Sequence, residues 1–186
     1  SCRAQSAMTR LPELFATLPA VFAASYDPER PWMLLDAPIE ELLAALPSAE
    51  ILGRVHPGAH LLGDRIFLGK GSRLAPGAVV EGPAWIGEDV EIRVGAYLRG
   101  GCWVGDGCVV GANVEMKRAI LFPGAHAAHL NYVGDSILGC EANLGAGVIL
   151  SNFRHDGQEI RIPAGNRERL ATGKRKLGAI LGDGVA

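Results

Sequence analysis

Two cations and one histidine are placed where they could do chemistry together. Arg99 and Lys117 are separated by 18 positions, and His129 follows Lys117 by twelve. Two neighbouring cations repel each other unless an anion lies beside them. The pair could therefore bind a phosphate group, the alternative being two solvated surface charges. An imidazole titrates near neutral pH, so His129 could act as a general base, the alternative being an ordinary surface or turn histidine.

A repeat of six residues would bring these side chains together. Every sixth residue from Leu68 onward is apolar, which would arise by chance roughly once in a thousand if half of all residues were apolar. The positions are Leu68, Leu74, Val80, Ile86, Ile92, Leu98, Val104, Val110, Met116 and Phe122. The fifth residue of each hexad is mostly small. These residues are Ser72, Ala78, Ala84, Val90, Ala96, Cys102, Cys108 and Val114.

This periodicity predicts an all-β fold, a parallel β-helix in which large and then small side chains point into a narrow core. Three hexads close one triangular coil of about 18 residues, and each coil contacts its neighbours. Arg99 and Lys117 should therefore stack on the same face in successive coils.

The repeat also predicts the domain organisation. Residues 1–50 form an N-terminal tail and a helical cap over one end of the prism. This region is expected to contain one helix at Leu11–Ala24 and a second at Ile39–Leu46, for which Asp36 is the N-cap. Residues 51–186 form the β-helix domain. Its register slips after Phe122, which places His129 in an irregular loop. His126 falls on a fifth position counted from Phe122 and is expected to point inward. Residues 152–176 form an inserted loop with seven basic and three acidic residues, and insertions that leave a solenoid often carry function.

Bulk composition excludes some classes of function. The net charge of −2 over 186 residues gives no electrostatic reason to expect binding to nucleic acid or membrane. Residues 14–24 could be read as a signal peptide, but Glu13 and Pro19 interrupt that pattern and favour a packed helix. Cys102 and Cys108 occupy inward positions, so we interpret them as core residues. These features favour the cytoplasm, and no metal is expected in the chemistry.

Four short motifs are more specific than the hexads. They are NVEMK from Asn113, HLNYVGD from His129, NLGAG from Asn143 and SNF from Ser151. Together they resemble the acetyltransferase domain of the bifunctional glucosamine-1-phosphate N-acetyltransferase / N-acetylglucosamine-1-phosphate uridylyltransferase family, over about residues 55–186. The tail TGKRKLGA from Thr172 is similar to the archaeal branch.

The resemblance implies a left-handed β-helix and an N-acetyltransferase that moves acetyl from acetyl-CoA to the amine of glucosamine-1-phosphate or a similar amino-sugar phosphate. His129 matches the general base, and Glu115 could orient it. Asn143 and Asn152 match amides that position the sugar, with Asn152 at the reacting groups. The backbone N–H of Ala146 matches a donor near the acetyl-CoA thioester.

The same resemblance assigns the phosphate site. Arg99 and Lys117 match cations that hold the phosphate, Tyr132 matches a hydroxyl donor there, and Lys176 matches a further lysine. It also implies a homotrimer with active sites between subunits.

Two departures from the family pattern modify these expectations. No Gly-rich phosphate loop precedes the repeats, so uridylyl transfer is not expected. The chain also ends at Ala186, where the family continues through more coils, so we expect either a fragment of a longer chain or a reduced coenzyme site. Two alternatives stay open: an N-acyltransferase for another nucleotide- or amino-sugar, and a non-catalytic sugar-phosphate-binding or assembly module.

Overall fold

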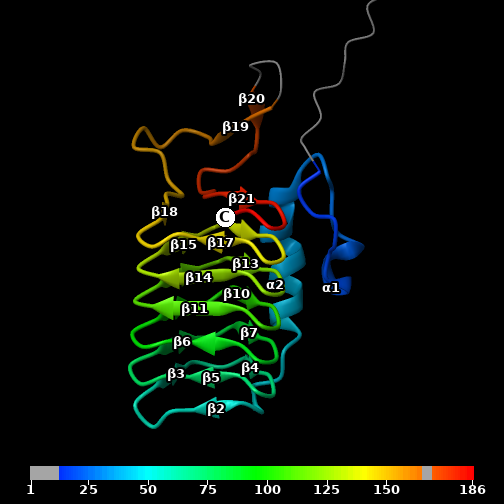
Figure 1. Ribbon diagram of the computed structural model, residues 1–186. Helices are drawn as coiled ribbons and strands as arrows, with labels where there is room; N and C mark the ends of the chain where they lie inside the picture. The colour runs from blue at the N-terminus through cyan, green and yellow to red at the C-terminus, as the bar shows by residue number, and fades with distance from the viewer. Residues whose placement is uncertain (1–12, 165–168) are drawn as a thin grey trace, which may run out of the picture.

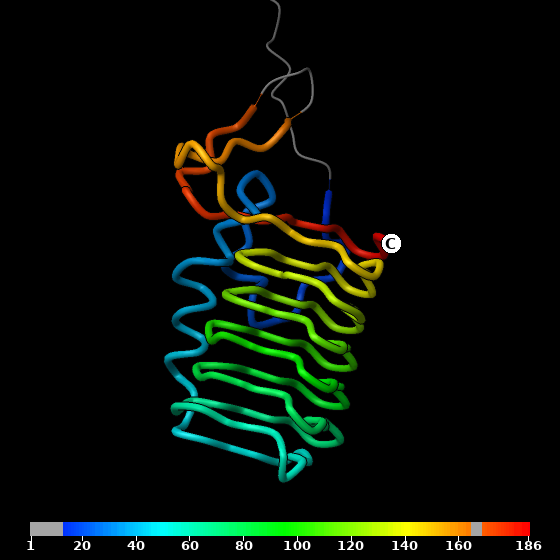
Figure 2. Tube along the Cα trace, turned by 90° about the vertical axis from the view of Figure 1, so that its left-hand side faces the viewer, coloured from blue at the N-terminus to red at the C-terminus, as the bar shows by residue number. Residues whose placement is uncertain are grey.

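The computed structural model describes residues 13–164 and 169–186, and within them the chain winds into a parallel β-helix (Figures 1 and 2). Each turn of the helix contributes one short strand to each of three parallel sheets, which we name A, B and C. The predicted all-β fold of hexapeptide repeats is therefore confirmed. Left-handed winding stays a prediction from the family resemblance.

The sheets are built from strands that recur once per coil. Sheet A contains β1 (Ala49–Ile51), β4 (Ile66–Leu68), β7 (Ala84–Ile86), β10 (Cys102–Val104), β13 (Ile120–Leu121), β16 (Ile137–Leu138) and β21 (Ile180–Leu181). Sheet B contains β2 (Arg54–Val55), β5 (Arg73–Leu74), β8 (Glu91–Ile92), β11 (Val109–Ala112), β14 (His126–His129) and β17 (Asn143–Leu144). Sheet C contains β3 (His60–Leu62), β6 (Val79–Glu81), β9 (Tyr97–Arg99), β12 (Glu115–Lys117), β15 (Tyr132–Gly134) and β18 (Ile149–Leu150).

The core of the prism is the one that the repeat predicted. The first-position residues from Leu68 to Met116 and the small fifth-position residues are all buried. Ser72 is the polar member of the small set, and it is satisfied because its Oγ donates to the Gly87 carbonyl and accepts from the Val90 N–H. An interior this narrow is close-packed because large and small side chains alternate.

One predicted core residue, Phe122, lies outside the prism. Partners in sheet A are 18 residues apart between Ile86 and Val104 but 17 apart between Val104 and Leu121. The corner after Met116 is one residue shorter than in the coil before, so Leu121 points inward in place of Phe122. Phe122 is still fully buried, because its ring packs against Phe15 and Phe22 on the outer side of sheet A.

Because of the shorter corner, the predicted placements of His126 and His129 are both wrong. The chain does not become irregular after Phe122, since residues 126–129 form β14 and pair in register with β11. Ala125 and Ala127 fill the core positions of this coil, so His126, between them, faces outward on sheet B. His129 ends the strand.

The N-terminal segment covers a side of the prism, not its end. It contains α1 (Ala20–Ala23), the 3₁₀ helix η1 (Pro31–Leu35) and α2 (Ala37–Ala44). Figure 1 shows α2 running alongside the stacked coils. The predicted helix at Leu11–Ala24 is wrong for its described part, since only the four residues of α1 are helical. The helix after Asp36 is confirmed, although the Asp36 side chain forms no capping hydrogen bond.

The reason for this placement lies on the outer face of sheet A, which is apolar. Phe67 and Trp85 stack there with ring centroids 4.0 Å apart, and the face continues with Trp103, Ile120 and Ile137. Side chains from the N-terminal segment complete this second core. They include Phe15, Phe22, Trp32, Leu34, Leu35, Ile39 and Leu43. Burying two large apolar surfaces against each other is worth far more than covering the small end of a prism.

The segment after β18 leaves the stack of coils. Within its described residues it forms an antiparallel hairpin of β19 (Arg161–Pro163) and β20 (Arg169–Ala171), after which the chain returns to sheet A as β21. Figure 1 shows the hairpin projecting beyond the last coil.

Burial of the cysteines leads to a first testable prediction. Cys102 and Cys108 are fully buried core residues, and desolvation raises the pKa of each thiol to about 12. Because the thiolate is the reactive form, neither should react with an alkylating reagent at pH 8 until the protein is denatured. Mass spectrometry of iodoacetamide-treated peptides checks this. Fast labelling of both residues in the native protein would contradict it.

Candidate functional site

The outer face of sheet C carries the predicted phosphate-binding cations. Glu115 pairs with Tyr97 and Met116 with Leu98 across β12 and β9, so Lys117 follows in the position over Arg99. The expected stacking is therefore present. Arg99 donates from Nη1 to Glu115 Oε1 at 2.7 Å, and this hydrogen bond raises the pKa of the guanidinium. Lys117 has no ion pair among the described residues, which leaves its charge available to an anion.

The next coil places Tyr132 and Asn152 on the same face. Tyr132 lies over Glu115 in the register of β15 and β12, and Gly134 lies over Lys117. Asn152 Nδ2 is 3.2 Å from Tyr132 Oη. A Cβ at Gly134 would lie 2.6 Å from that hydroxyl and 2.7 Å from the amide nitrogen. Glycine is therefore required for both side chains to lie over the strand beside Lys117.

His129 lies at the corner between sheets B and C, with an exposed side chain. Its backbone is fixed from two sides, because its N–H donates to Asn131 Oδ1 at 3.2 Å and its carbonyl accepts from the Gly147 N–H at 3.1 Å. Ala146 precedes Gly147 in the same turn of the following coil. His129 and Ala146 thus occupy one corner in successive coils, with the imidazole itself free of recorded hydrogen bonds among the described residues.

The three remaining predicted residues, Lys176, Asn143 and Glu115, lie in three different environments. Lys176 forms an antiparallel bridge with Phe153, so the return of the inserted segment brings it next to Asn152. Asn143 pairs with His126 on sheet B and is separated from the Tyr132 group within one chain. Glu115 contacts Arg99 and not His129, so the orienting role expected for it does not follow from this arrangement.

Comparison with known proteins agrees with the repeat. Residues 83–118 match the family described as "Bacterial transferase hexapeptide (six repeats)". This stretch of the chain is therefore similar to the hexapeptide-repeat transferases. The resemblance drawn from its motifs is confirmed by similarity to bifunctional proteins. One is the GlmU protein of Oleidesulfovibrio alaskensis, 36% identical over 143 residues that span 74% of this chain and 28% of the relative.

A second relative is the bifunctional sugar-1-phosphate nucleotidylyltransferase/acetyltransferase of Sulfurisphaera tokodaii. It is 40% identical over 76 residues, 41% of this chain and 19% of the relative. The hexapeptide chain therefore spans about a quarter of the length of these relatives. Among solved structures, perosamine N-acetyltransferase from Caulobacter crescentus in complex with CoA and GDP-perosamine aligns at 20% identity with a TM-score of 0.39, over 67% of this chain and 54% of that one.

The hexapeptide domain also contains charged residues that spacing alone did not single out. Asp135 is buried, and its Oδ1 lies 3.1 Å from Arg118 Nε. The Arg118 guanidinium also lies 3.9 Å from Asp36 at the start of α2, and Asp36 in turn pairs with Lys174 from the inserted segment. Asp135 belongs to the HLNYVGD motif, so the motif could have marked it as a candidate site residue. Nothing in the sequence indicated that its side chain is buried.

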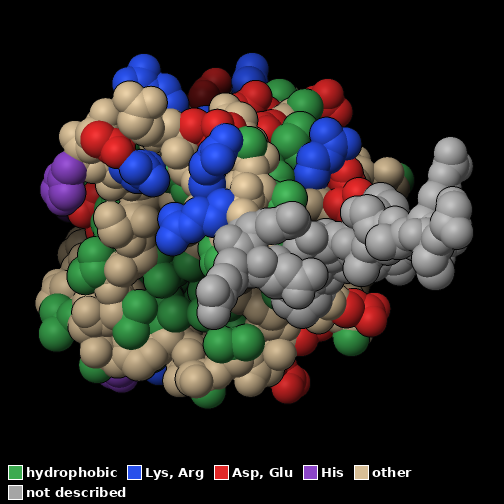
Figure 3. Space-filling view, turned by 90° about the horizontal axis from the view of Figure 1, so that it is seen from above, with side chains coloured by type: hydrophobic (Ala, Val, Ile, Leu, Met, Phe, Trp, Pro, Cys, Tyr) green, Lys and Arg blue, Asp and Glu red, His purple; other side chains and the backbone are tan. Residues whose placement is uncertain are grey.

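Basic side chains gather at the C-terminal end of the molecule, where this insertion lies (Figure 3). No described helix is both long and apolar enough to cross a membrane. In the part of the chain that the structure describes, His, Cys, Asp and Glu side chains form no cluster suited to a metal ion.

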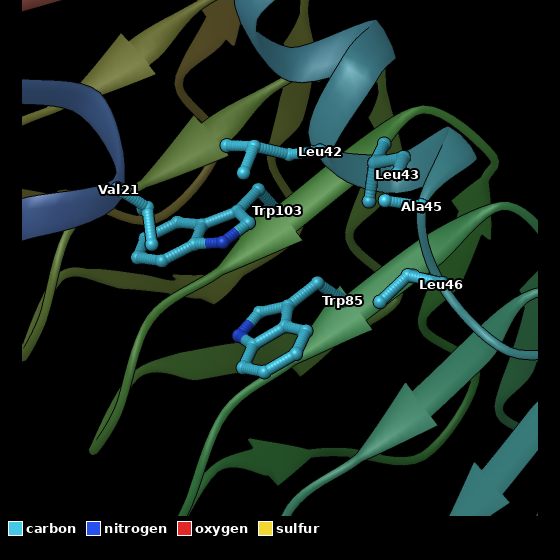
Figure 4. A pocket seen from close by; sticks show the side chains of 7 residues that line it. All are labelled: Val21, Leu42, Leu43, Ala45, Leu46, Trp85 and Trp103. Atoms are coloured by element: carbon cyan, nitrogen blue, oxygen red, sulfur yellow. The ribbon is translucent and has the colours of Figure 1, made fainter. Parts of the chain in front are cut away.

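A pocket on sheet A is apolar, unlike the charged face of sheet C. It lies between α2 and the tryptophan pair of β7 and β10, has a volume of about 160 Å³ and is lined by apolar side chains. Figure 4 shows Trp85 and Trp103 on one side and Leu42, Leu43 and Leu46 on the other. It contains no titratable group, so it is a gap in the second core and offers no acid–base chemistry.

Proposed function

We propose that this chain is an N-acetyltransferase that moves acetyl from acetyl-CoA to the amine of glucosamine-1-phosphate or a similar amino-sugar phosphate. The observation that carries the proposal is the stack of Arg99, Lys117 and the Tyr132–Asn152 pair on one face of sheet C. Such a group offers two cations and hydrogen-bonding side chains to a phosphorylated polar ligand. Lys176, beside Asn152, adds a third cation.

The chemistry needs no covalent intermediate with the protein. His129 takes the proton from the sugar ammonium, and the neutral amine attacks the thioester carbonyl. The C–N bond forms, the tetrahedral oxyanion collapses, and the C–S bond breaks to release the coenzyme A thiol after protonation. The N–H of Ala146, in the coil above His129, is suited to hold the thioester at this corner. Cys140 takes no part, because burial raises the pKa of its thiol and its Sγ lies against the Thr17 carbonyl.

A homotrimer is part of the proposal. Among the residues that the structure describes, the N-terminal segment packs on sheet A and not on sheets B and C, whose outer faces we propose meet neighbouring copies. Asn143, which lies on sheet B of one chain, could then reach a sugar bound on sheet C of the next.

The direct test is product formation. Purified protein, acetyl-CoA and glucosamine-1-phosphate should yield the N-acetylated sugar phosphate by mass spectrometry, with coenzyme A released in equal amount. Assays with a panel of nucleotide- and amino-sugars show whether the enzyme acetylates a different acceptor by the same chemistry. Binding of the sugar phosphate without any acetyl transfer would favour a non-catalytic module.

Removing either stacked cation should weaken sugar-phosphate binding. Arg99→Ala and Lys117→Ala each delete one charge-assisted contact worth about 1.5–3 kcal/mol, which corresponds to a KM for the sugar about 10- to 150-fold higher. The KM for acetyl-CoA should change little. Arg30→Ala is the matched control, because Arg30 also pairs with a carboxylate, that of Asp27, but in the N-terminal segment. Unchanged sugar affinity in both cation variants would place the phosphate elsewhere.

A further inference from the structure

A buried carboxylate lies directly behind the Tyr132–Asn152 pair. Asp135 is 2% exposed. Its Oδ2 accepts from Asn152 Nδ2 at 2.5 Å, and its Oδ1 faces Arg118 at ion-pair distance. Its backbone is also fixed, since its N–H donates to the Lys117 carbonyl and its carbonyl accepts from the Gly178 N–H. A carboxylate paired with a guanidinium can only accept hydrogen bonds.

This carboxylate determines how the amide of Asn152 must be oriented. The two ends of an asparagine amide are distinguished by their partners. An acceptor-only neighbour requires the NH₂ group, whose second hydrogen points to Tyr132 Oη at 3.2 Å. Both amide hydrogens are thus used within the protein. The carbonyl oxygen of Asn152, which has no recorded partner among the described residues, is left to accept from a ligand.

The orientation of the Asn152 amide also determines the hydrogen-bond direction at Tyr132. Its hydroxyl oxygen receives a hydrogen from Asn152, so its own hydrogen is free to donate to a third group. The neighbouring positions on sheet C hold Lys117 and Arg99, which attract an anion. A phosphate oxygen is an acceptor and suits a hydroxyl that donates.

We propose that Asp135 is a positioning residue that sets the donor and acceptor polarity of the site. Through Asn152 it makes Tyr132 a donor to the phosphate and presents the Asn152 carbonyl to an amine or hydroxyl of the sugar. The acceptor substrate is thereby bound in one orientation, with its phosphate toward Tyr132, Lys117 and Arg99. This proposal rests on the proposed function for its kinetic part, but its hydrogen-bond part can be tested without any substrate.

The ligand-free test measures the side-chain amide of Asn152. In protein with ¹⁵N-labelled asparagine, the Asn152 NH₂ signals are identified by their loss in Asn152→Ala. Asp135→Asn keeps the size of the side chain but removes the charge that fixes the amide. Hydrogen exchange of the Asn152 NH₂ should then become at least about tenfold faster, as expected when a buried charge-assisted bond is lost. Unchanged exchange in a folded variant would overturn the proposal, whether or not the protein is an enzyme.

The kinetic test is a double-mutant cycle with Tyr132→Phe. Asp135→Asn alone should raise the KM for glucosamine-1-phosphate about tenfold and leave the KM for acetyl-CoA within about twofold. In the Tyr132→Phe background the same change should raise this KM by clearly less than tenfold, because the hydroxyl that it orients is gone and only the contact of the Asn152 carbonyl with the sugar is left to lose. A merely structural role for Asp135 would produce the full loss in both backgrounds, and that result would overturn the proposal.

Two further variants keep this test decisive. Asp156→Asn is the matched control, since Asp156 accepts from Arg154 in the inserted segment and should leave both KM values unchanged. If Asp135→Asn does not fold, Asn152→Ala replaces it. That change removes both the hydrogen that Asn152 gives to Tyr132 and its own contact with the sugar, so its effect on the sugar KM should be smaller in the Tyr132→Phe background than in the unchanged protein. Equal losses in both backgrounds would again contradict the proposal.

Discussion

Under the proposed function, replacing His129 by alanine should lower kcat for amino-sugar acetylation by about 10²–10⁴-fold, the usual contribution of a general base. Sugar-phosphate affinity should stay close to that of the unchanged protein, because the cations of sheet C are untouched. The fold should also tolerate the change. The His129 side chain is exposed, and its neighbours are fixed by hydrogen bonds from its backbone. Steady-state kinetics and binding of the sugar phosphate by calorimetry give the two quantities.

His126→Ala is the matched control for this prediction. His126 belongs to the same strand but lies on sheet B next to Asn143, and its loss should change kcat by less than about threefold. Near-normal turnover of the His129 variant would remove the imidazole from the mechanism.

Replacing Val104 by aspartate should unfold the β-helix. Val104 is fully buried between Ile86 and Leu121 in the stack of sheet A. An unpaired carboxylate at that position costs several kcal/mol, a large part of the 5–15 kcal/mol by which a typical domain is stable. Far-UV circular dichroism and urea denaturation should show loss of the cooperative transition, or an insoluble product.

Val94→Asp tests whether the effect comes from burial. Val94 is 55% exposed at a turn of the same repeat, so the same substitution should alter the free energy of unfolding by less than about 0.5 kcal/mol. A folded Val104→Asp protein with normal stability would show that this side chain does not point into the core.

The repeat predicted most of the fold because stacking contacts in a solenoid join residues about one coil apart. A side chain such as Leu98 has the same environment as Met116, its partner in the next coil, so spacing alone places it. The prediction failed where this regularity ended. The corner after Met116 has one residue fewer, and periodicity carried forward from Leu68 therefore put Phe122 in the core in place of Leu121.

The N-terminal segment could not be placed from its own pattern. Its apolar residues required burial, but the surface that buries them is made by Trp85, Trp103 and Ile120, which belong to separate coils. The repeat makes no prediction for these outward residues, because a period of six identifies the inward residues and leaves the outer face unassigned.

For the candidate site, the sequence by itself determined that Arg99 and Lys117 stack. The family resemblance, and not the period, assigned Tyr132 to the same site, because the spacing between coils changes from 18 to 17 residues after Met116. Only the tertiary structure decided that Asn152 reaches this face and that Asp135 is buried behind its amide. Asn143 lies on another face because β17 pairs with β14 in sheet B. The inserted segment, on its return, pairs Lys176 with Phe153 and closes over Asp135, whose carbonyl accepts from the Gly178 N–H. Its path is set by ion pairs such as Lys174 with Asp36, which join residues far apart in the chain and follow no period.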